Sequence, residues 1–128
     1  MELLALTAEP ESAMLWLTLG TIVGDQGDID QAEIFYSEAL RLEPDYAKAH
    51  YNLGRAYGLT ARNDEAEAEY RAALREDPNY AYAHTNLGLL LNERGRFSEA
   101  EPHFQAALRA QPQLTLAQDG LTRARRGP

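Results

Sequence analysis

Cysteine is absent from the 128-residue chain, and long apolar runs are scarce. Without cysteine there is no disulfide framework, no thiol nucleophile and no thiolate metal ligand. No apolar run approaches the roughly 20 residues that cross a bilayer, and the opening MELLALTAEP lacks the basic segment of a signal peptide. We therefore expect neither a membrane partner nor a membrane span. The cytoplasm is the default location, with export or a periplasmic location left open.

Positive charge is scarce in the first third of the chain. The net charge is −8, and residues 1–46 carry ten acidic side chains against one basic side chain. Such a surface repels phosphate, so nucleic acid is not an expected partner. The sequence also offers no glycine-rich phosphate loop, no paired-carboxylate site and no nucleophile triad. We therefore predict that the chain is not an enzyme and needs no cofactor.

The chain does contain one unit written three times. The segments GDIDQAEIFYSEALRLEP, ARNDEAEAEYRAALREDP and GRFSEAEPHFQAALRAQP begin at residues 27, 61 and 95, a spacing of 34. When the chain is aligned on this period, apolar and small residues recur three and four positions apart, as on one face of a helix. The pattern predicts first helices at residues 13–26, 47–60 and 81–94, and second helices at residues 30–43, 64–77 and 98–111. An acidic or hydroxyl residue three positions before a glutamate, as at Asp30 and Glu33, predicts a capping box at each second helix.

The first unit carries the most specific set of residues: Trp16, Leu19, Gly20, Val23, Ala32, Tyr36, Ala39 and Pro44. In this order and at this period they resemble the tetratricopeptide repeat signature. The resemblance implies an all-α fold, a right-handed superhelical stack of antiparallel helix pairs, known as an α-solenoid. We predict repeats at residues 13–46, 47–80 and 81–114, and a closing helix with a basic tail at residues 115–128. Residues 1–12 align with the tail of an incomplete preceding repeat.

The resemblance implies that the first helices line a concave groove that binds a peptide or a partner protein. The face of these helices opposite the core is rich in apolar and aromatic residues, whereas a face used only for solvation would be mostly charged. The candidate groove residues are Met14, Leu17, Thr21, Lys48, Tyr51, Asn52, Arg55, Tyr82, Thr85, Asn86 and Leu89. The alternative is that these side chains, above all Tyr51, pack between neighbouring repeats.

The ligand is predicted only by class. Asn52 and Asn86 are equivalent positions, and the resemblance implies that asparagine there bonds the backbone of a bound peptide. Lys48 and Arg55 are the cations of the predicted groove and favour an acidic or carboxylate-bearing ligand. The chaperone-binding branch of the family clamps a terminal carboxylate with lysine, asparagine and arginine. This chain departs from that set in its first and third repeats, so a chaperone tail is not an expected ligand.

The histidines are the only candidates for a metal site. His50 and His84 occupy the same column of the repeat, but that column normally packs against the preceding helix, and no carboxylate accompanies them at ligand spacing. We therefore predict packing and no metal. His103 is expected to lie alone, at the surface or its boundary.

Two other functions stay open. The incomplete repeat at the amino terminus favours self-assembly into a homo-oligomer, with Leu3, Leu4 and Leu6 as candidate contacts. The chain also fits a regulatory arm of a larger protein, because its first residue falls inside a repeat. The identity of the partner does not follow from the sequence.

Overall fold

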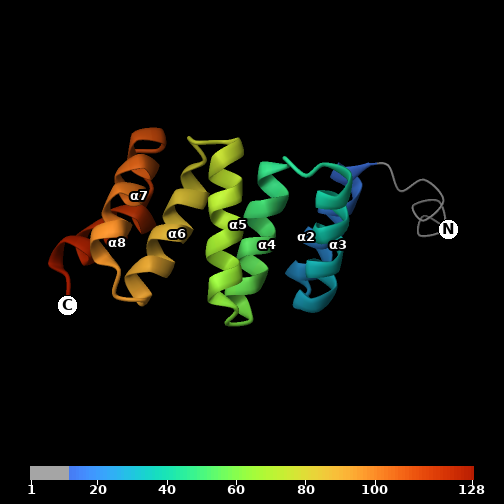
Figure 1. The fold of residues 1–128 in the computed structure, drawn as a ribbon, viewed down its shortest axis with the longest axis horizontal. Helices are drawn as coiled ribbons and strands as arrows, with labels where there is room; N and C mark the ends of the chain where they lie inside the picture. Colours follow the sequence, from blue (N-terminus) through green and yellow to red (C-terminus); the bar gives the residue numbers. More distant parts are fainter. Residues whose placement is uncertain (1–11) are drawn as a thin grey trace.

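A computed structural model of the chain describes residues 12–128, which fold into a row of helix pairs (Figure 1). The first helices are α2 (Ala13–Asp25), α4 (Ala47–Leu59) and α6 (Ala81–Glu93). The second helices are α3 (Ile29–Leu42), α5 (Asn63–Glu76) and α7 (Phe97–Ala110), and α8 (Thr115–Arg126) closes the row. The described residues contain no strand, which confirms the predicted all-α helical repeat solenoid. Each repeat helix begins and ends within one residue of its predicted bounds, whereas the boundaries of the repeats themselves stay a prediction.

Glycines on the first helices allow each pair to pack closely. In the second pair, a Cβ added at Gly54 would lie 2.7 Å from the ring of Tyr70. Gly20 meets Tyr36 and Gly88 meets Phe104 in the same way. Because the first helix carries no side chain at this position, the aromatic ring of the second helix lies directly on its backbone.

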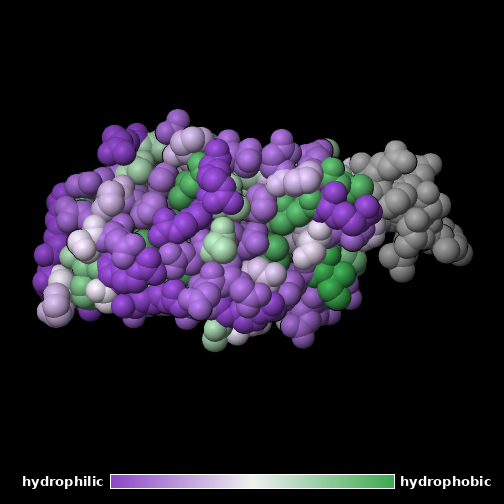
Figure 2. Space-filling model, viewed as in Figure 1, coloured by the Kyte–Doolittle hydropathy of each residue, from purple (hydrophilic) through white to green (hydrophobic). Residues whose placement is uncertain are grey.

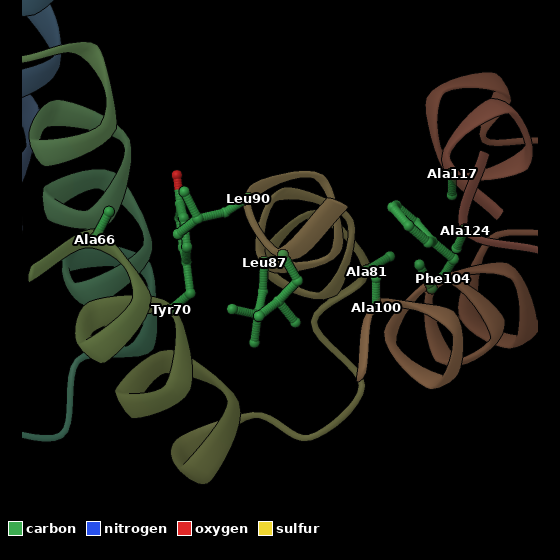
Figure 3. Packing of buried hydrophobic residues seen from close by; sticks show 11 residues of the cluster. Ala66, Tyr70, Ala81, Leu87, Leu90, Ala100, Phe104, Ala117 and Ala124 are labelled. Carbon is green, nitrogen blue, oxygen red and sulfur yellow. The ribbon is translucent and has the colours of Figure 1, made fainter. Parts of the chain in front are cut away.

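The core is continuous from one pair to the next. Leu87, Leu91 and Phe104 are completely buried. Figure 3 shows Tyr70 of α5 directed toward Leu90 of α6, and Phe104 lying between α7 and α8. The closing helix α8 buries Ala117 and Ala124 in this core and leaves its arginines exposed. Among residues 12–128, no helix is both long and apolar enough to cross a membrane.

The predicted capping boxes are wrong. The second helices begin one residue earlier than predicted, so Asp30 and its equivalents lie inside the first turn. The N-cap of α3 is Asp28, whose carboxylate accepts a hydrogen bond from the amide of Gln31. The N-caps of α5 and α7 are Arg62 and Arg96, and neither makes a side-chain cap.

Two of the three glutamates of the predicted boxes bind an arginine of the following repeat instead. Arg62 donates to both carboxylate oxygens of Glu33, at 2.8 and 2.9 Å. Arg96 binds Glu67 in the same way, at 2.8 and 3.2 Å. Within the row, the upstream repeat therefore supplies an acid and the downstream repeat supplies a base. The first repeat has Asp28 where the later repeats have these arginines.

Candidate peptide-binding groove

Three adjoining hollows follow the first helices along one side of the row. The first lies between α2, α3 and α4, the second between α4, α5 and α6, and the third between α6 and α8. Arg55 and Leu59 line both the first and the second hollow, and Leu89 and Glu93 line both the second and the third. Because neighbouring hollows share these residues, the three hollows adjoin one another in a row, which we call the groove. Its other polar and charged lining residues include Thr21, Asp25, Asn52, Asn63, Asn86, Asn92, Asp119 and Arg123.

The structure divides the predicted groove residues into four groups. Thr21, Asn52, Arg55, Asn86 and Leu89 line the groove. The exposed residues that line none of its three hollows are Met14, Lys48 and Tyr82.

Leu17 and Thr85 correct the prediction, because both are buried and line none of the three hollows, whereas Asn52, which is also buried, borders the first hollow. The hydroxyl of Thr85 is turned back to the carbonyl of Ala81, at 2.9 Å. Neither side chain is therefore presented to a ligand. The candidate self-association residues Leu3, Leu4 and Leu6 lie outside the described residues.

Tyr51 packs against two tyrosines of its own repeat and contacts one residue of the next repeat. Its ring centroid lies 5.0 Å from that of Tyr80 and 6.1 Å from that of Tyr70. Its hydroxyl accepts a hydrogen bond from Nδ2 of Asn86, at 3.3 Å. Burial raises the pKa of Tyr51, so its hydroxyl stays protonated at neutral pH. Tyr51 thus positions Asn86, which lines the second hollow.

One column of the groove was missed from the sequence. Asp25, Leu59 and Glu93 are spaced by 34 residues and line successive hollows. Each lies four residues after a predicted groove residue of the same helix, as Leu59 follows Arg55. The sequence pattern that could have identified this column is the exposed face of the first helices, which continues for one more helical turn beyond the predicted residues. Leu59 is 69 % exposed and places an apolar side chain at the junction of two hollows.

Charge alternates along the groove. Arg55 is the single cation among the residues that line the first two hollows, with Asp25 in the first and Glu93 in the second. The guanidinium of Arg55 lies 5.9 Å from the ring centroid of Tyr51. In the third hollow, the guanidinium carbon of Arg123 lies 4.6 Å from the ring centroid of Phe97, so the two side chains stack. The first two hollows thus present a base between two acids.

The histidine column connects neighbouring repeats. Nε2 of His50 lies 2.8 Å from the carbonyl oxygen of Pro44, and Nδ1 lies 2.7 Å from a carboxylate oxygen of Glu69. Since both partners are acceptors, both contacts are hydrogen bonds when the ring carries a proton on each nitrogen. The hydrogen bond to Glu69 raises the pKa of His50. Glu69 lies 19 residues after His50, beyond the metal-ligand spacing at which carboxylates were sought, and was therefore not anticipated from the sequence.

His84 repeats the arrangement with a different partner. Its Nε2 donates to the carbonyl of Pro78 at 2.8 Å, and its Nδ1 lies 3.0 Å from Nδ1 of His103. His103 is therefore not alone, and burial lowers its pKa to about 4. Residues 12–128 contain no cluster of three or more histidine or carboxylate side chains that would hold a metal ion.

The same column holds Gln118 and Trp16 in the outer units. Nε2 of Gln118 donates to the carbonyl of Pro112 at 2.9 Å, which reproduces the bond made by the two histidines. Trp16 is buried against Phe35, with 5.7 Å between ring centroids. Its Nε1 has no acceptor within the described part of the chain. The carbonyl six positions earlier belongs to residue 10, which lies outside that part.

Two family models match the repeated part of the chain. The model described as "Tetratricopeptide repeat" matches residues 60–115, and the one described as "TPR repeat" matches residues 20–60. The chain belongs to the tetratricopeptide repeat (TPR) family. The family is generally an interaction fold and not a catalytic one.

Solved TPR structures share the fold at low sequence identity. The first TPR domain of Spaghetti (RPAP3), bound to the HSP90 peptide SRMEEVD, is 20 % identical with a TM-score of 0.85, over 89 % of this chain and 90 % of that one. The Arabidopsis OM64 TPR domain is 24 % identical with a TM-score of 0.84, over 89 % and 94 %. YrrB, described as a TPR protein with an unusual peptide-binding site, is 24 % identical with a TM-score of 0.84, over 91 % and 60 %. No curated protein sequence matches the chain.

Proposed function

We propose that this TPR protein is a non-catalytic scaffold that binds an extended peptide, or an extended segment of a partner protein, in the groove. The observation that carries the proposal is the adjacency of the three hollows, which share Arg55, Leu59, Leu89 and Glu93. A row of open hollows suits a chain better than a compact small molecule, which is usually enclosed. The HSP90 peptide complex of one protein with this fold and the peptide-binding site described for another support the same conclusion.

The groove charges define the class of peptide. A carboxylate side chain of the ligand meets Arg55, and basic side chains on either side meet Asp25 and Glu93. An apolar ligand residue covers the exposed Leu59. Asn86 is partly exposed in the second hollow, and its amide oxygen is free to accept a hydrogen bond from the ligand backbone, whereas Asn52 borders the first hollow but is buried. A ligand with several acids and no bases fits this pattern poorly.

A peptide selection tests the proposal. Random peptides displayed on phage are selected on the immobilised chain, and the enriched peptides are titrated in solution by fluorescence anisotropy. We expect an acidic residue flanked by basic residues among them. Arg55→Ala should weaken their binding about tenfold, because a central arginine often dominates an interface. Arg109→Ala is the charge-matched control, since Arg109 is an exposed residue of α7 that lines no hollow of the groove, and it should leave binding unchanged.

Two results would contradict the proposal. One is a selection that enriches no peptide. The other is a set of enriched peptides whose affinity is the same for the unmodified chain, Arg55→Ala and Leu59→Asp, because such peptides bind elsewhere.

A further inference from the structure

Within residues 12–128, no preceding helix covers an apolar stripe on α2 at the amino-terminal end of the row. We call Leu15, Leu19 and Ile22 the amino-terminal stripe. Leu15 is 51 % exposed and Ile22 is 48 % exposed. Their equivalents in α4, α6 and α8 are all buried: Ala49, Ala83 and Ala117 for Leu15, and Ala56, Leu90 and Ala124 for Ile22. Those later helices are covered by the second helix that precedes each of them, as α3 covers α4.

The composition of α2 also fits a covered helix. Its residues 13–24 include no charged side chain. A helix without a charged face is normally buried on all sides. Figure 2 shows hydrophobic residues gathered at the end of the molecule where α2 and α3 lie, beside a largely hydrophilic surface over the other helices. The stripe is therefore built for contact with another element.

Charge identifies the kind of element. At the two interior junctions, Arg62 and Arg96 of the downstream repeat bind a glutamate of the upstream helix. At the open end the downstream residue is Asp28, so a helix that docks there needs a base where the interior helices carry a glutamate. The exposed Asp30 adds to the negative charge of this end. Because Leu15 replaces the alanine of the other repeats, the docked helix also needs small side chains opposite it.

We propose that the amino-terminal stripe binds a helix of a partner protein that carries an alanine-rich face flanked by lysine or arginine. The site is separate from the groove and gives the protein a second binding surface. A second copy of the chain fits less well. Two amino-terminal ends would bring like charges together, and α8 at the opposite end has its small residues Ala117 and Ala124 already buried.

The absence of cysteine allows a direct test in the full chain. Ile22→Cys introduces one thiol on the stripe, and Leu59→Cys introduces one in the groove as the matched control. The rate of maleimide labelling is measured for each variant, alone and with a helical peptide. The probe is residues 63–80 of this chain with Glu67→Lys, held helical by a hydrocarbon staple on the face opposite its alanines. This segment is the interior helix that covers the equivalent stripe on α6.

We expect the lysine probe at saturation to slow labelling of the Ile22→Cys variant about tenfold and to leave the Leu59→Cys variant unchanged. The same peptide with glutamate at position 67 should bind about fivefold more weakly, as for an ion pair replaced by like charges. Adding Asp28→Arg should reverse the preference between the two peptides. This substitution is compatible with the fold, because Arg62 and Arg96 are N-caps at the equivalent positions.

Three results would overturn the proposal. Equal binding of the two peptides would remove the charge argument. Slow labelling of Ile22→Cys without peptide, at a rate that depends on protein concentration, would show that a second copy occupies the stripe. Slow labelling at every concentration would show that the chain covers the stripe itself. Failure of the groove proposal leaves these readings unchanged, because the Leu59→Cys variant reports on the groove separately.

Discussion

At the scale of single residues, each repeat has a contact between a first-helix residue and the second-helix residue 19 positions later. The side chains that make this contact differ from repeat to repeat. Trp16 stacks on Phe35, His50 binds Glu69, and His84 meets His103. The backbone geometry is the same in each repeat, but the pH response is not. Glu69 raises the pKa of His50, whereas burial lowers the pKa of His103.

The two histidines should affect stability in opposite directions. A lowered pKa in the folded state means that unfolding takes up a proton, so the His103 contribution is lost as pH falls from about 6.5 to about 4. His103→Phe, which copies Phe35, should therefore lose less stability over this range than the unmodified chain. We expect a difference of about 1–2 kcal/mol, because a half-exposed ring is partly screened by solvent. Urea unfolding at each pH measures it.

His50→Gln is the contrasting variant. Glutamine preserves the bond to Pro44, as Gln118 does for Pro112, but removes the charge. Because the pKa of His50 is raised, its stabilisation is complete below about pH 6.5 and is lost as pH rises through that higher pKa. The unmodified chain should be more stable than this variant at pH 6, and the difference should shrink at alkaline pH. Parallel pH profiles for the two proteins would contradict this reasoning.

At the scale of elements, each helix pair depends on the contact between a glycine and an aromatic ring. Gly54→Ala would place a Cβ 2.7 Å from Tyr70 and should destabilise the chain by about 1–3 kcal/mol through overpacking. Gly58→Ala is the matched control on the same helix, since its Cβ would lie 3.9 Å from the hydroxyl of Tyr70. That change should stabilise by about 0.5–1 kcal/mol, because alanine favours the helix. Thermal unfolding of both variants tests the contrast, and equal effects would refute it.

Elements were predictable from sequence where a signal was repeated. The period of 34 repeats the first helix and the second helix of the pair three times each. A chance similarity at one position therefore does not shift the predicted helix bounds. Caps were harder, because Asp30 and Glu33 match a capping box in sequence, while the arginine that binds Glu33 lies in the next repeat. The same limit applies to His103, whose partner is 19 residues away on another helix. Local spacing does not report such contacts.

The groove was partly predictable for the same reason. Helical periodicity identifies the face that carries Arg55 and Asn86, but not where along the helix the hollow ends, so Leu59 was missed. Periodicity also does not show whether a residue at the edge of that face is exposed or is covered by an adjacent helix. Leu17 and Thr85 were therefore assigned to the groove although both are buried.

At the scale of the whole molecule, stability should vary along the row. Each pair of helices is stabilised mainly by its immediate neighbours. The α2–α3 pair has a described neighbour on one side only, whereas α6 packs between α5, α7 and α8. We expect amide hydrogens of α2 and α3 to exchange with solvent faster than those of α6, because local opening begins at the less supported end. Hydrogen exchange followed by mass spectrometry tests this order, and uniform exchange would indicate that the row unfolds as one unit.

The arginine–glutamate junctions have a consequence for how such a chain can lengthen. Arg62 and Glu67 both belong to residues 47–80, and each is bound to an adjacent repeat. Suppose that segment were duplicated in tandem. The Arg62 of the second copy would then bind the Glu67 of the first copy, and the outer Arg62 and Glu67 would keep their present partners in the flanking repeats. The interior is thus a compatible template for growth by whole units. Asp28 breaks the pattern. A duplicated unit placed ahead of α2 would bring its Glu67 against Asp28, and these two acids would repel each other. Growth in that direction would therefore need a compensating change of charge.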